Sequence, residues 1–306
     1  MKRFHLGQSE LMVPAVAVGA MRLGELEPAQ AERFVRTAVE LGANFFDHAD
    51  IYGGGACEEL FGRILRNAPG LRDRILLQSK CSIVPGVMYD CSRRHILEAV
   101  DGSLKRLHTD HLDVLLLHRP DALVEPEEVA EAFDALQAAG KVRHFGVSNH
   151  RPAQIRLLSR YLHQPILADQ LQLSLTESNM IRSGMEANMT TEGAADRDGG
   201  VLDFCRLHDI TIQAWSPFQY GFFKGTFLGH PAFPELNRVL DELAEKYGTT
   251  NTGIAAAWLL RHPANIQVVM GTAREQRLRE ICAAADIVLE REEWYRLYLA
   301  AGHILP

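Results

Sequence analysis

The chain has 306 residues, of which 47% are hydrophobic and 23% are charged, and its formal net charge is -7. These proportions are typical of a globular protein that buries a core of its own. A net negative charge argues against nucleic acid as the main partner, because phosphate binding requires a basic surface. No apolar run reaches the length of a membrane span, and the first residues lack the apolar segment of a secretory signal.

The cysteines are scattered along the chain and none stands in a Cys-x-x-Cys spacing. This pattern argues against a disulfide framework or a zinc site and favours free thiols. We therefore expect a cytoplasmic protein. The five positions are Cys57, Cys81, Cys91, Cys205 and Cys282.

Short apolar runs alternate with amphipathic helical patterns along the chain. A turn at Gly7 between two short alternating segments predicts an N-terminal β-hairpin over residues 2–13. Helical patterns with a typical start and stop, such as Pro126 and Gly140, separate the strand-like runs that follow. Eight such runs are predicted, at residues 16–18, 44–46, 74–79, 112–117, 142–147, 166–169, 211–215 and 266–270.

Eight strands that alternate with helices favour a parallel sheet with helical crossovers. A closed (β/α)8 barrel, the TIM barrel, fits the count and the length better than two doubly wound domains. An open dinucleotide-binding sheet should carry a Gly-x-Gly-x-x-Gly turn after an early strand, and Gly53-Gly54-Gly55 lacks that spacing. We expect an α/β fold, with one barrel domain over residues 1–306.

Two connections are longer than the alternation requires. Residues 174–200 and 217–233 both follow strands, so they should form long loops at the C-terminal mouth of the barrel, where barrel enzymes bind substrate. The second connection is rich in aromatic residues, which either form an apolar wall for the substrate or pack against one another within the loop. These residues are Phe218, Tyr220, Phe222, Phe223 and Phe227.

Polar residues with complementary chemistry stand at the ends of neighbouring predicted strands. Asp47 and Tyr52 follow the second strand, Lys80 ends the third and His118 follows the fourth. A lysine ammonium lowers the pKa of a nearby phenol, which is ordinarily about 10, and an aspartate holds the lysine in place. An imidazole can hydrogen-bond a carbonyl oxygen and share the proton-donating role. This set predicts a general-acid site for a carbonyl that becomes an alcohol, with hydride from a reduced nicotinamide.

The segment Phe46-Asp47-His48-Ala49-Asp50-Ile51-Tyr52-Gly53 resembles the Asp-x-Ala-x-x-Tyr-Gly signature of the aldo-keto reductases. Lys80 and Leu117-His118-Arg119-Pro120 are similar to the other positions of that family's catalytic tetrad. The resemblance spans nearly the whole chain. It implies reduction of a small-molecule aldehyde or ketone, with Tyr52 as general acid, Lys80 lowering its pKa, Asp47 orienting Lys80 and His118 polarising the carbonyl.

The same resemblance implies a nicotinamide cofactor site. Gly146-Val147-Ser148-Asn149 is similar to the motif whose serine and asparagine, with Gln170, hydrogen-bond the carboxamide, and Trp215 would stack on the nicotinamide ring. Ala20 replaces the family's threonine in the first-strand contact. The implied cofactor contacts are Gly19, Ala20, Met21, Ser148, Asn149, Gln170, Trp215, Ser216, Pro217, Phe218, Gly271, Thr272, Arg277 and Glu280.

The segment after the last strand departs from the pattern of members that prefer the phosphorylated cofactor. Gly271 stands where those members have lysine and Ile281 where they have asparagine. A 2′-phosphate at the N-terminus of the last barrel helix would use its amides and an arginine fork. Arg277 can supply that fork, whereas Arg274 either joins it or is a solvated surface charge. We expect NADPH, with NADH as the alternative.

Two other functions are compatible with these residues. Some relatives in the family serve as cofactor-sensing regulatory subunits with vestigial activity, and an intact tetrad is expected in both cases. A barrel lyase that uses Lys80 as a Schiff-base amine would need neither Ser148 nor Trp215. The sequence names neither the substrate nor the oligomeric state.

Overall fold

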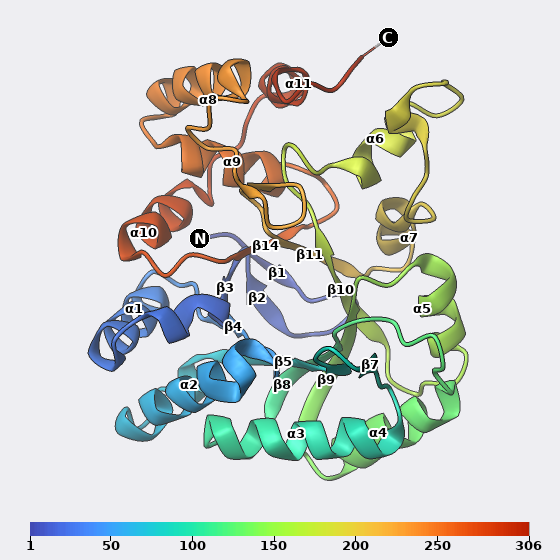
Figure 1. Cartoon of the computed structure of the whole chain (residues 1–306). Coiled ribbons are helices and arrows are strands. Elements are labelled where there is room, and N and C mark those ends of the chain that lie inside the picture. The colour runs from blue at the N-terminus through green and yellow to red at the C-terminus, as the bar shows by residue number, and fades with distance from the viewer. Residues whose placement is uncertain (306) are drawn as a thin grey trace.

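Eight parallel strands close into a barrel in the computed structural model, which describes residues 1–305 (Figure 1). Each strand pairs with the next one along the chain, and the last pairs with the first. The TIM barrel predicted from the sequence is therefore confirmed. Its strands are β3 (Val16–Gly19), β4 (Phe45–Asp47), β5 (Leu76–Cys81), β8 (Leu112–Leu117), β9 (Val142–Ser148), β10 (Ile166–Gln172), β11 (Thr211–Trp215) and β14 (Gln267–Met270).

Helices surround this ring of strands on the outside (Figure 1). Their apolar stripes pack on the barrel, as at α3, where the predicted stripe of Ile96, Val100 and Leu107 is buried. None of the helices in residues 1–305 has the length and apolar character that a bilayer crossing needs. They are α1 (Pro28–Glu40), α2 (Ala56–Asn67), α3 (Arg93–Leu107), α4 (Pro126–Ala138), α5 (Pro152–Ser159), α6 (Asn179–Met185), α7 (Val201–Leu207), α8 (Pro234–Tyr247), α9 (Asn251–Leu260), α10 (Glu275–Ala284) and α11 (Arg291–Ala300).

The predicted N-terminal hairpin is present as β1 (Arg3–His5) and β2 (Met12–Pro14). Only Ala15 separates Pro14 from β3, so the hairpin lies at the N-terminal end of the barrel strands, and in Figure 1 it is seen inside the ring of strands. Gly7 in its turn has a positive φ of 55°, and a Cβ there would lie 2.6 Å from the Leu167 carbonyl oxygen. Only glycine fits that close approach to the barrel.

Both long connections are more ordered than the sequence suggested. The connection after β10 contains α6 and the 3-10 turn η4 (Glu192–Ala194), and the one after β11 contains the small hairpin β12 (Gln219–Tyr220) and β13 (Gly225–Thr226). Residues 174–200 are rich in Ser, Gly and Asn, so their composition does not predict α6. Tertiary contacts rather than intrinsic helix propensity stabilise a helix this short. The buried Glu186 at its end accepts hydrogen bonds from Arg182 and Thr191. That residues 1–306 form a single domain stays a prediction.

The remaining short elements lie in the connections between the barrel strands and the surrounding helices. They are the 3-10 turns η1 (Ala20–Glu25), η2 (Tyr52–Gly55) and η3 (Arg72–Arg74), and the small hairpin of β6 (Ile83–Val84) and β7 (Met88–Tyr89). The turn η1 directly follows β3, and η2 begins shortly after the end of β4. They therefore carry the chain across the C-terminal ends of two neighbouring barrel strands.

Candidate active site

A cavity of about 760 Å³ opens at the C-terminal ends of the barrel strands. This volume lies within the range of small-molecule sites, and barrel enzymes place their chemistry at this end. Most of the predicted site residues line it: Gly19, Met21, Asp47, Tyr52, His118, Ser148, Asn149, Gln170, Trp215, Ser216, Pro217, Phe218, Gly271, Thr272 and Arg277. Ala20, Lys80 and Glu280 are not among its lining residues.

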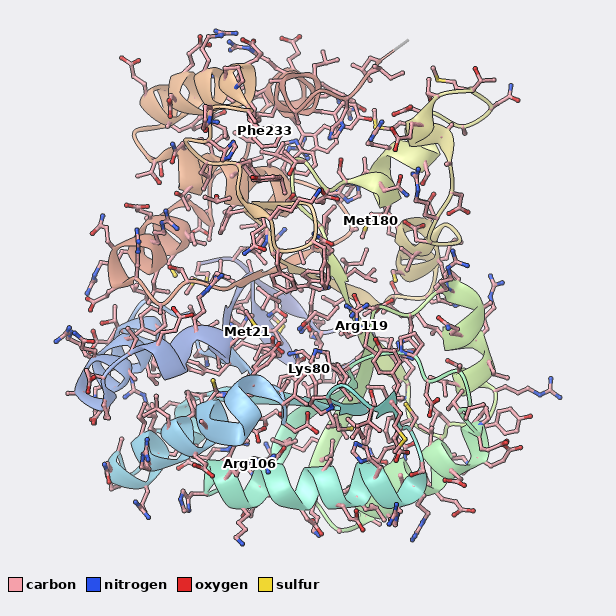
Figure 2. All side chains as sticks on the ribbon, viewed as in Figure 1. Met21, Lys80, Arg106, Arg119, Met180 and Phe233 are labelled. Atoms are coloured by element: carbon pink, nitrogen blue, oxygen red, sulfur yellow. The ribbon has the colours of Figure 1, made fainter. Side chains whose placement is uncertain are left out.

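Lys80 of β5 is fully buried beneath the cavity, and its partners come from the end of the neighbouring strand β4. Its Nζ donates to Asp47 Oδ1 at 2.7 Å, to Asp47 Oδ2 at 2.8 Å and to the His48 carbonyl oxygen at 2.7 Å. Burial lowers the pKa of Lys80, but the Asp47 carboxylate and Tyr52 raise it, and the net shift is upward. Lys80 is therefore a fixed ammonium group at the centre of the barrel, where Figure 2 labels it.

Tyr52 begins η2, the turn that follows β4, and its ring lies above the lysine. The Lys80 Nζ is 5.0 Å from the centroid of this ring. Burial raises the pKa of Tyr52 and the Lys80 ammonium lowers it, with a net upward shift. The lowering expected from the sequence is thus present, but desolvation of the phenolate outweighs it. Tyr52 is accordingly a neutral phenol with a cation beneath it.

His118 follows β8, and its ring stands edge-on to Tyr52 with 6.0 Å between the ring centroids. Burial, together with the charges of Lys80 and Arg119, lowers the pKa of His118 to about 2. The imidazole is therefore neutral at physiological pH. Its Nδ1 is buried and has no hydrogen-bond partner within residues 1–305.

The residues expected to hold a carboxamide lie together at the ends of β9, β10 and β11. Ser148 Oγ donates to the Gln170 carbonyl oxygen at 2.8 Å, and Asn149 Nδ2 donates to Ser148 Oγ at 2.8 Å. Trp215 Nε1 donates to Asn149 Oδ1 at 3.1 Å. Asn149 is held by these bonds in a left-handed conformation with a φ of 60°, which asparagine tolerates better than most residues.

The aromatic residues of the 217–233 connection fall into two groups, some lining the cavity and others packing within the connection itself. Phe218 and Phe223 line the cavity, and Phe223 stacks on Trp215 with 5.9 Å between the ring centroids. Phe227 is fully buried, and Tyr220 packs on Phe233, which Figure 2 labels away from the barrel centre. Part of the segment therefore forms an apolar wall and part packs on itself. One face of Trp215 is covered by Phe223 in this arrangement.

The loop after β14 brings two arginines to the far part of the cavity. Arg274 precedes the first turn of α10 and Arg277 lies within it, and both line the cavity. Within residues 1–305, neither guanidinium forms a hydrogen bond or ion pair, whereas the neighbouring Arg279 pairs with Glu275. Arg274 is exposed and also lines the cavity, so both alternatives left open by the sequence remain. Glu280 instead accepts a hydrogen bond from Gln276.

Several cavity residues were not identified from the sequence. Arg22 donates to the Gly271 carbonyl oxygen at 2.5 Å and so connects η1 to the loop after β14. Arg119 lines the cavity beside His118, and its position directly after a tetrad residue was the signal that could have found it. Ile83 and Gln219 come from the small hairpins, whose placement over the mouth no local pattern reveals.

Comparison with known proteins agrees with the observed fold. The model of the aldo/keto reductase family matches residues 15–298. The chain is 36% identical to the oxidoreductase YcsN of Bacillus subtilis (strain 168), over the full length of both chains. It is 33% identical to a 6-dehydroglucose reductase of Agrobacterium fabrum (strain C58 / ATCC 33970), over 95% of each chain.

A solved structure of an aldo/keto reductase from Klebsiella pneumoniae, in complex with NADP and acetate, superposes with a TM-score of 0.76 at 27% identity. The match covers 97% of this chain and 94% of that one. Fold, cavity position and sequence similarity agree over nearly the whole chain. The chain therefore belongs to the aldo/keto reductase family and is an NAD(P)H-dependent oxidoreductase.

Proposed function

We propose that this protein reduces an aldehyde or ketone to an alcohol with NADPH, and that Tyr52 is the general acid. One observation carries the proposal: the buried Lys80, clamped by Asp47, lies beneath the ring of Tyr52 where Tyr52 and His118 face the same cavity. The reaction needs a hydride at the carbonyl carbon and a proton at the carbonyl oxygen. When bound, the reduced nicotinamide supplies the hydride.

Tyr52 supplies the proton from its hydroxyl group to the carbonyl oxygen. The upward shift of its pKa keeps the phenol protonated at neutral pH, so the proton is available to donate. The phenolate that remains lies close to the Lys80 ammonium, which stabilises the negative charge. Asp47 holds that ammonium through both carboxylate oxygens.

His118 acts by hydrogen bonding rather than by proton transfer. Because its pKa is lowered to about 2, the imidazolium is not populated at neutral pH. A neutral imidazole still has one N–H with which to orient and polarise the carbonyl oxygen. We therefore assign the proton to Tyr52 alone and drop the shared donation expected from the sequence.

The cavity fits a phosphorylated dinucleotide. At one end the side chain of Gln170 offers its oxygen, Oε1, which accepts no hydrogen bond within residues 1–305, and Trp215 lines the same cavity. At the other end Arg274 and Arg277, both without an anionic partner in the described chain, stand at the N-terminus of α10. Helix amides and arginines favour a phosphate group there. This favours NADPH over NADH.

Titration of the protein with NADPH and with NADH, followed by tryptophan fluorescence, tests the cofactor assignment through Trp215. Stopped-flow oxidation of bound NADPH by a panel of aldehydes and ketones then tests the reaction. We expect tighter binding of NADPH and oxidation by at least one carbonyl class. Binding without oxidation by any carbonyl would contradict the reductase and favour the cofactor-sensing alternative. Trapping of a carbonyl on Lys80 by borohydride would favour a lyase.

A further inference from the structure

The interior of the barrel below the cavity contains a connected set of glutamine side chains. TIM-barrel interiors are usually filled by branched apolar residues. Here Gln78 of β5, Gln213 of β11 and Gln267 of β14 are fully buried, and Gln170 of β10 is 3% exposed. We call these four residues the glutamine network. Only Gln170 lines the cavity.

The network spans the barrel from wall to wall and from end to end. Gln78 and Gln213 exchange hydrogen bonds of 2.9 and 3.1 Å, and their strands lie four positions apart on the eight-stranded ring. Gln213 Nε2 also donates to Gln267 Oε1 at 2.8 Å, and Gln267 Nε2 donates to the Pro14 carbonyl oxygen at 2.8 Å. Pro14 marks the N-terminal end of the strands. The opposite end of the network reaches Asp47 at their C-terminal end.

The two ends fix the orientation of every amide between them. A backbone carbonyl can only accept, so Gln267 must turn its NH2 group to Pro14 and its oxygen to Gln213. Gln213 must then turn its NH2 group to Gln267, which leaves its oxygen for other donors. At the upper end the Asp47 carboxylate also only accepts. The network is therefore directional, with no amide free to flip without losing hydrogen bonds on both sides.

Gln170 is the one member of the network that lines the cavity, so the orientation of its amide decides which atom the cavity is offered. Its Nε2 donates to Asp47 Oδ1 and to Gln213 Oε1, each at 3.1 Å. Both amide protons are thus used inside the barrel, and the side chain presents only its carbonyl oxygen to the cavity. Gln78 Nε2 donates in the same way to Asp47 Oδ1 at 2.6 Å and to Gln213 Oε1. Gln213 therefore holds both amides that contact Asp47.

We propose that the glutamine network is a positioning device in which Gln213, anchored by Gln267, orients Gln170 as a hydrogen-bond acceptor for the carboxamide N–H of the nicotinamide. The inference rests on the proposed function, because it presumes that the cofactor's carboxamide reaches Gln170. Gln213 and Gln267 act through Gln170 and Asp47 and touch neither cofactor nor substrate. The same hydrogen bonds connect cofactor recognition to Asp47, which clamps Lys80.

A cofactor analogue tests this acceptor role. In the 3-acetylpyridine analogue of NADPH a methyl group replaces the carboxamide NH2, so no N–H is available to Gln170. A neutral hydrogen bond contributes about 1 kcal/mol, which corresponds to about 5-fold in affinity. We therefore expect the wild type to bind NADPH at least about 5-fold more tightly than the analogue in a fluorescence titration.

Gln213→Met removes the anchor of Gln170 while keeping a side chain of similar length. We expect the preference for NADPH over the analogue to fall to about 2-fold or less, because Gln170 can then rotate. Gln267→Met, one residue further from the cavity, is expected to reduce the preference by a smaller factor. Gln164→Met is the matched control, because Gln164 is also a buried glutamine, and within residues 1–305 its side chain bonds only to Asp134 and Gln137. It should leave the preference unchanged.

An unchanged preference in folded Gln213→Met would overturn the inference while leaving the proposed function intact. Absence of NADPH binding in the wild type would overturn both. The wild type offers an independent measurement in case the substituted proteins do not fold. The side-chain amide NMR signals of Gln213 and Gln267 should shift on addition of NADP⁺ although neither lines the cavity, and the absence of a shift would contradict the network.

Discussion

Replacement of Asp169 by asparagine should remove a large part of the pH dependence of stability. Asp169 lies in β10 next to Gln170, is fully buried, and has one carboxyl oxygen without a partner in residues 1–305. Its other oxygen faces the backbone N–H of His150 at 3.5 Å. Burial raises the pKa of Asp169 from 3.8 to about 8, and hydrogen bonds from the backbone of His150 and Asn149 only partly oppose that rise.

The sign and the size of the pH dependence of stability follow from this shift in the pKa of Asp169. Between pH 4 and pH 8 the folded chain holds a proton on Asp169 that the unfolded chain has lost, so the free energy of unfolding decreases as the pH rises. A difference of about 4 pKa units corresponds to about 5 kcal/mol over that window. Above pH 8 the folded carboxyl is ionised as well, and the loss is complete. Asparagine mimics the neutral acid and carries no such cost.

Urea unfolding of the wild type and Asp169→Asn between pH 5 and pH 8.5 measures the effect. The difference in unfolding free energy should grow in favour of the variant by several kcal/mol between pH 5 and pH 8.5. Asp203→Asn, at a surface position with a side chain 74% exposed, controls for the loss of one carboxylate. A difference between wild type and Asp169→Asn that stays constant across the range would refute the reasoning.

Three further predictions concern the charged groups of the site. Lys80→Met should lower the free energy of unfolding by about 3–5 kcal/mol, because it leaves the buried Asp47 carboxylate without its cation, and adding Asp47→Asn should recover part of that loss in urea titrations. Arg277→Ala should weaken NADPH binding about 10-fold while leaving NADH binding nearly unchanged, and equal losses for both cofactors would contradict a phosphate contact. The guanidinium of Arg119 has no partner in residues 1–305 and lines the cavity, so it should favour carbonyl substrates that carry a carboxylate. Arg119→Leu should therefore reduce kcat/KM for succinic semialdehyde relative to butanal by about 10-fold. An unchanged ratio would count against that contact.

The barrel was predictable because its signals are local. Runs such as Leu112–Leu117 are apolar except for Asp113, since both faces of a barrel strand are buried, and the helices between such runs have recognisable starts and stops. That the residues of the proposed tetrad lie close together was predictable for a related reason. The carboxyl ends of parallel strands meet at one mouth, so Asp47, Lys80 and His118 had to approach one another once the barrel was assigned.

The glutamine network was not predictable, because its members are single polar residues in otherwise apolar strands. Gln78 and Gln213 are 135 positions apart and meet only across the closed barrel. The balance of effects on Tyr52 was likewise hidden. Sequence reveals the lysine that lowers the pKa of Tyr52, but the burial that raises this pKa by more depends on which side chains pack around the ring in the folded chain, such as His118.

The central claim is that Tyr52 donates the proton. The most direct test is a single-turnover measurement of NADPH oxidation by the best carbonyl substrate in the wild type and in Tyr52→Phe, with NADPH affinity measured for both. The phenylalanine keeps the ring that faces His118 and Lys80 and removes only the hydroxyl group. We predict NADPH affinity within about 3-fold of the wild type, and an oxidation rate reduced by a factor of about 100 or more. Oxidation at the wild-type rate in Tyr52→Phe would contradict the mechanism.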